Sequence, residues 1–175
     1  MTQMECAVAM RKYADMVMRI ALNYCKNKYD AEDITQEVFC KLVRTTQSPS
    51  AKSRSVMEFN DEEHLKRWLI RVAINECNSW FVTPWHKKTG YLEDEEIPEK
   101  VYNREEKSEL YDVVMSLPKK YRMVIYLYYY EEYPTKEIAD ILDIKEATVR
   151  AQLMRGRELI KGKLKEDILY EPQRI

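Results

Sequence analysis

Seven basic residues near the end of the chain form the densest group of side chains that could bind a ligand. They lie within residues 145–165, alongside two acidic residues, which gives this segment a net charge of +5. The seven are Lys145, Arg150, Arg155, Arg157, Lys161, Lys163 and Lys165. Lys and Arg neutralise backbone phosphates, and Arg can also donate two hydrogen bonds to a base edge. The segment therefore indicates nucleic-acid binding, although the whole chain has a net charge of -1.

A second group mixes cations with aromatic rings over residues 66–88. It contains Lys66, Arg67, Trp68, Arg71, Trp80, Phe81, Trp85, Lys87 and Lys88. Rings stack on unpaired bases while neighbouring cations follow the backbone, so this mixture is typical of a surface that binds single strands. Trp68 also belongs to an apolar helical stripe, which favours a core position for it. Trp80, Phe81 and Trp85 lie outside that stripe, and both roles stay open for them.

The sequence offers little for catalysis or for metal binding. Its cysteines, Cys6, Cys25, Cys40 and Cys77, are 19, 15 and 37 residues apart, whereas metal ligands usually occur in closely spaced pairs. We interpret them as reduced, mostly buried thiols; a zinc or redox site is the alternative. The chain has two histidines, no glycine-rich phosphate loop and no convergent carboxylates. We therefore predict a protein that is not an enzyme and needs no metal or cofactor.

The basic segment requires a scaffold, and its surroundings have the pattern of a helix-turn-helix. Thr135 is the predicted cap of a helix ending at Leu142, Asp143 suits a turn with left-handed φ, and a longer helix begins near Lys145. Ala139 is the small residue where the helices cross. The residues expected to lock both helices to a core are Ile138, Leu142, Ile144, Val149 and Leu153. The alternative is an ordinary helical hairpin with a solvated basic face.

The residues on the outward face of the second helix can be inferred from those expected to be buried. If Val149 and Leu153 are buried, the opposite side presents Thr148, Ala151, Gln152 and Arg155. We expect Gln152 and Arg155 to reach base edges in a major groove. The cations on the flank, Arg150, Arg157 and Lys161, are better placed for phosphates.

The first part of the chain is predicted to form three helices. Hydrophobic residues make up 45% of the chain and charged residues 34%, with 3 Gly and 6 Pro, a composition that favours helices over hairpins. The first stripe consists of Tyr13, Val17, Ile20, Ala21 and Tyr24. In the second helix, Asp30 is the predicted N-cap, Glu32 and Asp33 fall in the first turn, and the apolar line is Ile34, Val38 and Leu42.

A polar loop over residues 45–55 separates the second helix from the third. Asn60 and Glu63 resemble a capping box for that third helix. Its stripe consists of Leu65, Trp68, Leu69, Val72 and Ala73. These three helices form the first predicted domain.

We predict an all-α protein with two small helical domains: residues 1–82, an acidic linker over 83–105, and a helix-turn-helix domain over 106–175. Residues 93–109 carry eight acidic and three basic residues, a net charge of -5. After the linker we expect one short helix with Leu110, Val113, Val114 and Leu117, ended by Pro118, a helix from Tyr121, and two more short helices. The sequence has neither a membrane-spanning apolar run nor a secretory signal, which predicts a cytoplasmic protein without membrane insertion.

Three segments together resemble the bacterial sigma-70 superfamily. They are DAEDITQEVFCKL (30–42), LKRWLIRVAINECNSW (65–80) and LPKKYRMVIYLYYYEEYPTKEIADILDIKEATVRAQLMRGRELI (117–160). Within that superfamily the chain is similar to the small two-domain sigma factors of the extracytoplasmic-function (ECF) type. The likeness covers most of residues 10–165 in the expected order.

The resemblance implies a transcription initiation factor that binds core RNA polymerase and promoter DNA, with an anti-sigma factor as a further candidate partner. It assigns polymerase binding to Asp33, Gln36 and Glu37. It assigns the −10 element to Arg67, Arg71, Asn75, Trp80, Lys87 and Lys88. It assigns the −35 element to Thr148, Arg150, Ala151, Gln152, Arg155 and Arg157.

The sequence departs from the family pattern in two places. Residues 79–82 read SWFV where an acidic residue and arginines are usual, which concerns promoter melting. The last helix carries Lys145, Ala147 and Gly156 where Ser, Gly and Ala are commoner. Two alternatives therefore stay open: a sigma-like decoy that does not open promoters, and a helix-turn-helix regulator. The exposed polar stripe Asp33, Gln36 and Glu37 argues against the regulator.

Overall fold

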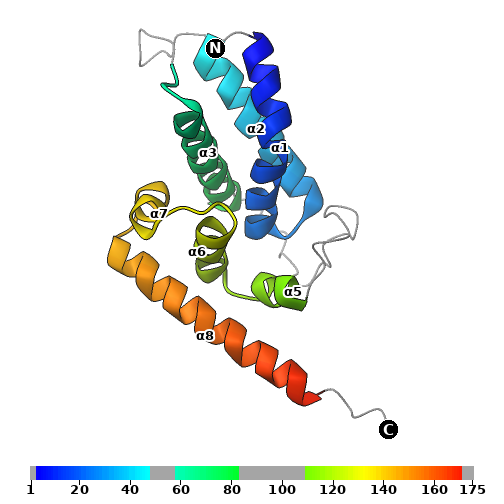
Figure 1. Cartoon of the computed structure of the whole chain (residues 1–175). Helices are drawn as coiled ribbons and strands as arrows, with labels where there is room; N and C mark the ends of the chain where they lie inside the picture. The colour runs from blue at the N-terminus through cyan, green and yellow to red at the C-terminus, as the bar shows by residue number, and fades with distance from the viewer. Residues whose placement is uncertain (1–2, 48–57, 83–108, 171–175) are drawn as a thin grey trace. The chain divides into compact units, whose positions relative to one another are not determined.

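The computed structural model describes residues 3–47, 58–82 and 109–170, and within these ranges the regular structure is α-helical without strands (Figure 1). The chain divides into two compact units, Met1–Pro98 and Glu99–Ile175. The predicted class, all-α with two helical domains, is confirmed. The linker predicted over 83–105 lies outside the described residues, so its bounds stay a prediction. In the described part of the chain, none of the helices is both long enough and apolar enough to cross a membrane.

The described part of the first unit consists of three long helices that all pack against one another (Figure 1). They are α1 (Gln3–Cys25), α2 (Lys28–Gln47) and α3 (Glu62–Val82). The predicted stripes meet in the core, where the buried members are Tyr13, Val17, Ile20, Ala21, Ile34, Val38, Leu42, Leu65, Leu69 and Ala73. Tyr24, Trp68 and Val72 lie at the edge and are half-buried. Three helices before residue 83 were predicted correctly.

The start of α2 differs from the prediction because a different side chain caps it. The Asn27 Oδ1 accepts the amide N–H of Tyr29 at 2.9 Å and that of Asp30 at 3.1 Å. Lys26 ends α1 with a φ of 53°, which turns the chain toward this cap. Asp30 therefore lies in the first turn of α2, and its prediction as N-cap was wrong.

The capping box of α3 is displaced by one residue from its predicted place. The Asp61 Oδ1 accepts the amide N–H of His64 at 2.7 Å, and the His64 Nδ1 accepts the amide N–H of Asn60 at 3.3 Å. The prediction of Asn60 and Glu63 was wrong: Asp61 is the N-cap, and the His64 side chain reaches back to the amide of Asn60, one residue before the cap.

The end of α2 extends into the stretch predicted as a loop. Thr46 is buried, and its Oγ1 donates to the carbonyl oxygen of Leu42 at 2.8 Å. The Thr46 Oγ1 also lies 3.3 Å from the Cys6 Sγ on α1. The helix therefore continues to Gln47, and residues 48–57 of the predicted loop lie outside the described part.

The second unit contains three shorter helices packed against one long helix (Figure 1). They are α5 (Glu109–Met115), α6 (Lys119–Tyr129), α7 (Thr135–Leu142) and α8 (Glu146–Tyr170). The prediction that two short helices close the chain was wrong for α8, which has 25 residues. Its sequence contains no proline, and α5, α6 and α7 all pack along it. Leu110 is exposed, unlike Val113 and Leu117.

A buried arginine connects α5 to α6. Arg122 is only 3% exposed, and its Nη1 donates to the carbonyl oxygens of Met115 at 2.8 Å and Leu117 at 3.1 Å. These carbonyls belong to the last residue of α5 and to a residue just after it, where backbone N–H partners within the helix are lacking. The guanidinium thus supplies hydrogen-bond donors to the backbone carbonyls between two helices that Pro118 separates.

Candidate functional site

The turn between α7 and α8 has the geometry expected of a helix-turn-helix. Asp143 adopts the left-handed conformation, with φ 54° and ψ 48°, and its amide N–H and that of Ile144 both bond the carbonyl oxygen of Ala139. Ala139 is buried as predicted, and so are Ile138, Val149 and Leu153. Leu142 and Ile144 are half-buried. The turn therefore fixes α8 by backbone hydrogen bonds and by apolar contacts.

Thr135 has a different function from the predicted cap. It is the first residue of α7, and no side chain caps that helix. Its Oγ1 donates to the Glu146 Oε1 at 2.7 Å, across the turn to the first residue of α8. This hydrogen bond holds the pKa of Glu146 below its usual value. A hydrogen bond from Arg150 lowers the pKa further, with a smaller effect. The side chain of Thr135 therefore joins the two helices instead of capping one.

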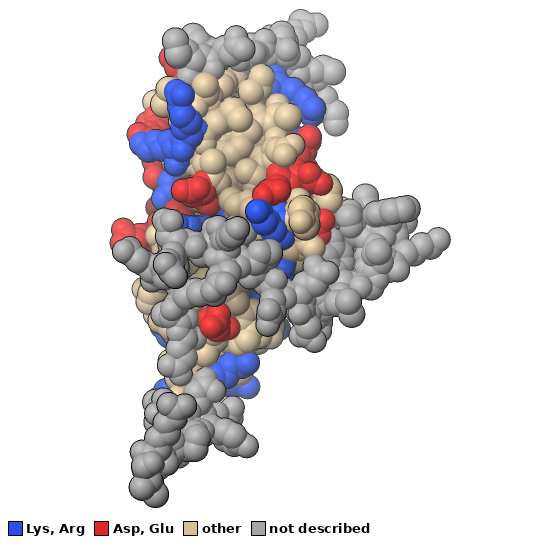
Figure 2. All heavy atoms as spheres, turned by 90° about the vertical axis from the view of Figure 1, so that its right-hand side faces the viewer, with Lys and Arg blue, Asp and Glu red and all other residues tan. Residues whose placement is uncertain are grey.

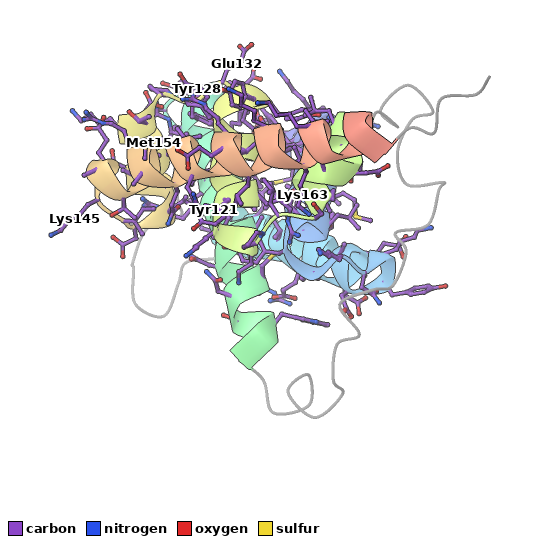
Figure 3. The ribbon with its side chains drawn as sticks, turned by 90° about the horizontal axis from the view of Figure 1, so that it is seen from below. Tyr121, Tyr128, Glu132, Lys145, Met154 and Lys163 are labelled. Carbon is purple, nitrogen blue, oxygen red and sulfur yellow. The ribbon has the colours of Figure 1, made fainter. Side chains whose placement is uncertain are left out.

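The outward face of α8 carries the residues predicted to read DNA. Thr148, Ala151 and Arg155 are exposed, and Gln152 is half-buried. Sequence reasoning missed Met154, which is 59% exposed on the same helix (Figure 3). Its spacing, three residues after Ala151, could have identified it.

Two of the three arginines on α8 form ion pairs within the helix. Arg150 lies 3.0 Å from the Glu146 carboxylate, and Arg155 lies 2.9 Å from that of Glu158. All four side chains are at least one-third exposed. Exposed pairs of this kind contribute about 0 to 1 kcal/mol, so a phosphate or base could replace either partner at small cost.

Arg157 is held by tyrosines instead of a carboxylate. Its Nε donates to the Tyr129 hydroxyl oxygen at 2.8 Å. Its guanidinium carbon lies 5.5 Å from the ring centre of Tyr128, which Figure 3 labels, and 5.6 Å from that of Tyr129. Tyr129 is 53% exposed. Sequence reasoning did not find this pairing, because the tyrosines are 28 and 29 residues away on α6.

The predicted −10 residues on α3 divide into an exposed row, one half-buried ring and two undescribed lysines. Arg67, Arg71 and Asn75 are exposed at four-residue spacing, so they lie along one side of α3. Arg67 pairs with Glu63 at 3.3 Å. Trp80 is half-buried near the end of α3. Lys87 and Lys88 lie outside the described residues.

The other aromatic residues before residue 89 are only partly described. Trp68 is half-buried, and the Phe59 ring meets it edge-on at 5.5 Å between centres. The stripe favoured a core position for Trp68, whereas the ring lies at the edge of the core. Nothing is described of the side chain of Phe81 or of Trp85.

The predicted polymerase-binding residues lie on the outer side of α2. Asp33 and Gln36 are exposed, whereas Glu37 is half-buried and pairs with Arg44 at 3.0 Å. Cys40 is exposed on the same side, four residues after Gln36. The helix is tied to α3 by an ion pair between Lys41 and Glu76.

The four cysteines are described by the structure, and three of them lie in the interior. Cys6, Cys25 and Cys77 are buried and Cys40 is exposed, so the prediction of mostly buried thiols is confirmed, and their reduced state stays a prediction. Among the described residues, no three His, Cys, Asp or Glu side chains form a group that could hold a metal. Figure 2 shows basic and acidic side chains bordering an uncharged area on one face of the first unit.

The family models that match this chain fall one in each of its two units. Residues 9–83 match the family described as Sigma-70 region 2, and residues 107–160 match Sigma-70, region 4. The chain is 30% identical over 160 residues to the ECF RNA polymerase sigma factor SigM of Bacillus subtilis, covering 86% of this chain and 89% of that one. It is 28% identical to SigW of the same organism over 173 residues, covering 88% and 86%.

A solved structure shares the fold. It is the sigma factor RpoE in complex with the anti-sigma factor NepR from Bartonella quintana, with a TM-score of 0.71 and 18% identity. The match covers 91% of this chain and 96% of that chain.

Proposed function

This chain belongs to the sigma-70 family as an ECF-type sigma factor, and from that premise we propose which of its surfaces performs each step of initiation. As a sigma factor it binds core RNA polymerase and promoter DNA and directs transcription initiation. It acts by binding and is not an enzyme, since the polymerase catalyses RNA synthesis. The proposal concerns the residues that carry each contact.

The −35 element is assigned to the outward face of α8. The observation that carries this assignment is the exposure of Thr148, Ala151 and Arg155 on the helix side opposite buried Val149 and Leu153. Arg155 can make the bidentate contact to guanine once its exposed pair with Glu158 opens. Gln152 is the second base-reading candidate, and Arg150 and Arg157 contact phosphates.

Polymerase binding is assigned to Asp33, Gln36 and Glu37 on α2. Two carboxylates and an amide on one exposed side of a long, well-buried helix form a rigid acidic row. Such a row suits a basic partner surface, where charge complementarity sets specificity and the rate of association.

The −10 element is assigned to Arg67, Arg71 and Asn75 along α3, together with Trp80, Lys87 and Lys88. The exposed side of α3 supports the first three. Trp80 lies in the last turn of α3, and Lys87 and Lys88 follow that helix in the sequence. Arginine and asparagine side chains can both contact backbone and base edges of an opened strand.

A binding assay combined with transcription tests these assignments. Purified full chain is mixed with bacterial core polymerase, captured, and then used for run-off transcription from a promoter library. Capture with new, sequence-dependent transcripts is expected. Capture without transcripts would favour a decoy, and failure of capture would favour a regulator that works without polymerase.

Two variants separate the polymerase and −35 surfaces. Asp33→Ala with Glu37→Ala is expected to weaken polymerase affinity by about tenfold, whereas Asp15→Ala, an exposed carboxylate on α1, serves as the control. Arg155→Ala is expected to lower discrimination between promoter and unrelated DNA by about tenfold. Unchanged polymerase affinity in the double variant would overturn the assignment of α2.

The partner and location follow from the same premise. The similar RpoE structure contains an anti-sigma factor, and we include such a protein among the proposed partners of this chain. We place its activity in the cytoplasm, with polymerase and promoter DNA. The proposed domain limits are 1–82 and 106–175. Co-purification from the producing cells would test the partner directly.

A further inference from the structure

We propose that Arg157 and Tyr129 together form a preorganised site for one backbone phosphate of the promoter duplex. The inference rests on the proposed −35 function of α8 and adds a residue of α6 to that surface. Tyr129 was not among the residues that the sequence assigned to DNA.

The hydrogen bond between the two side chains leaves donors for an anion. Arginine has five N–H donors, of which the Nε–H is used by the Tyr129 oxygen at 2.8 Å. The four Nη hydrogens remain, and the Tyr129 hydroxyl keeps its own hydrogen because it acts as the acceptor. A guanidinium edge and a hydroxyl that both donate are suited to an oxyanion.

The aromatic rings fix the guanidinium in place before any ligand arrives. Tyr128 and Tyr129 lie within 6 Å of it, in the range of cation–π contacts. The two rings themselves meet edge-on at 5.0 Å between centres. A side chain that is held in advance loses less conformational freedom on binding.

Arg157 differs in charge balance from the other arginines of α8. Arg150 and Arg155 each pair with a glutamate. Within the described part of the chain, Arg157 has no carboxylate within ion-pair distance, so its charge is neutralised only by what binds there. It should therefore bind phosphate without first breaking an ion pair.

A DNA phosphate is a better occupant than a protein carboxylate because of the neighbours on α8. Arg157 shares one flank of the helix with Arg150 and Lys161, both exposed. At a rise of about 1.5 Å per residue, Lys161 follows Arg157 by about 6 Å. A line of cations along a helix that presents a DNA-reading face is the arrangement expected for contacts to a phosphate backbone.

The test measures how holoenzyme, formed from the full chain and core polymerase, binds a selected promoter fragment at several salt concentrations. Arg157→Gln is expected to weaken binding about tenfold and to reduce the slope of log affinity against log salt by about 0.9. Tyr129→Phe keeps the ring and the arginine charge, so it should weaken binding about threefold without changing the slope. Tyr130→Phe, also exposed at the end of α6, is the matched control and should bind normally.

A combined variant tests whether the two side chains form one site. Tyr129→Phe is expected to have no further effect once Arg157→Gln is present, because the hydroxyl then lacks its partner. Replacing single phosphates by neutral methylphosphonates should weaken wild-type binding at one position and leave Arg157→Gln unaffected there.

Three outcomes would overturn the proposal. In the first, Tyr129→Phe binds like the wild type. In the second, its effect is equally large in the Arg157→Gln background. In the third, Arg157→Gln weakens polymerase capture with the salt slope for DNA unchanged, which would make the occupant a protein carboxylate. If one of these outcomes is found while Arg155→Ala still loses promoter discrimination, the −35 assignment is kept and only the phosphate site is rejected. If Arg155→Ala also retains full discrimination, the assignment of α8 fails as well.

Discussion

The two units hold their helices together by different polar contacts. In the first unit the charged side chains that join helices lie near the surface: Tyr13 donates to Glu62 at 2.6 Å, and Lys41 pairs with Glu76, whereas the buried contact of Thr46 with Cys6 is uncharged. The second unit also has an exposed contact between helices, Arg157 with Tyr129, but it contains a buried charged donor as well, since Arg122 donates to two backbone carbonyls. Long helices supply the first unit with a wide apolar core. In the second unit, the guanidinium of Arg122 links the short α5 to α6 by hydrogen bonds.

This difference indicates where each unit tolerates change. Surface ion pairs contribute about 0 to 1 kcal/mol, so the polar sides of α2 and α3 can vary with little loss of stability. A buried charged donor is costly to remove, because the carbonyls it satisfied lose their partner away from water. The proposed polymerase-binding and −10 surfaces therefore lie on a scaffold that tolerates substitution, and the proposed −35 surface lies on a sensitive one.

Removing the buried donor should give the largest effect. Arg122→Met keeps much of the side-chain volume but removes both hydrogen bonds, and we expect a loss of about 3 kcal/mol in the free energy of unfolding. Hydrogen exchange of the full chain should show faster opening of α5 to α8, with α1 to α3 unchanged. Equal acceleration in α1 to α3 would contradict independent stability of the two units.

The glycines of α8 test how closely the second unit is packed. A Cβ at Gly156 would lie 3.2 Å from the Ile125 Cγ1, whereas one at Gly162 would meet nothing within 4 Å. Gly156→Leu should therefore cost about 2 kcal/mol by overpacking. Gly162→Ala should instead stabilise the chain by about 0.5 to 1 kcal/mol through helix propensity. Denaturant unfolding of both variants measures the contrast, and similar losses at the two positions would contradict it.

The fold was predictable from sequence because apolar spacing records which side of each helix is buried. Apolar residues recur at helical intervals within each helix, and Val17 of α1, Val38 of α2 and Leu69 of α3 are all fully buried. The turn at Asp143 was predictable because Asp tolerates positive φ. Positive φ at Lys26 and Glu132 was not predictable in the same way, since neither residue type favours that conformation.

The candidate site was predictable only where residues act within one helix. The exposed sides of α2, α3 and α8 follow from their buried sides. Contacts between helices left no local signal: Thr135 with Glu146 spans 11 residues, and Tyr129 with Arg157 spans 28. The prediction of the helix caps was wrong for another reason. Asn27 and Asp61 are the caps, but nearby Asp30 and Asn60 are equally suitable residue types for that position.

A double-mutant cycle should show that the surface pairs of the first unit are weak. Lys41→Met, Glu76→Gln and their combination isolate the pair that ties α2 to α3. We expect a coupling energy of at most about 1 kcal/mol from denaturant unfolding. A coupling near the cost of Arg122→Met would remove the distinction between the two units.

The smallest effect concerns alkaline pH in the first unit. Burial raises the pKa of Tyr24 to about 12; the nearby Cys77 adds to this, and a hydrogen bond with Asn78 opposes it. In the unfolded chain the pKa is about 10. The folded state keeps its proton longer, so the stabilisation is complete below about pH 10 and is lost as pH rises toward about 12.

Tyr24→Phe removes this ionisation. Between about pH 9 and pH 11, the Tm of the first unit should therefore fall by about 2 °C less in Tyr24→Phe than in the wild type. Tyr130→Phe, on the exposed end of α6, controls for the loss of a tyrosine hydroxyl elsewhere. Parallel decreases in Tm for Tyr24→Phe and wild type would mean that Tyr24 ionises alike in both states, so that the contact between α1 and α3 at Tyr24 opens before the unit unfolds. The surface contacts of the first unit would then be even weaker than the comparison with Arg122 implies.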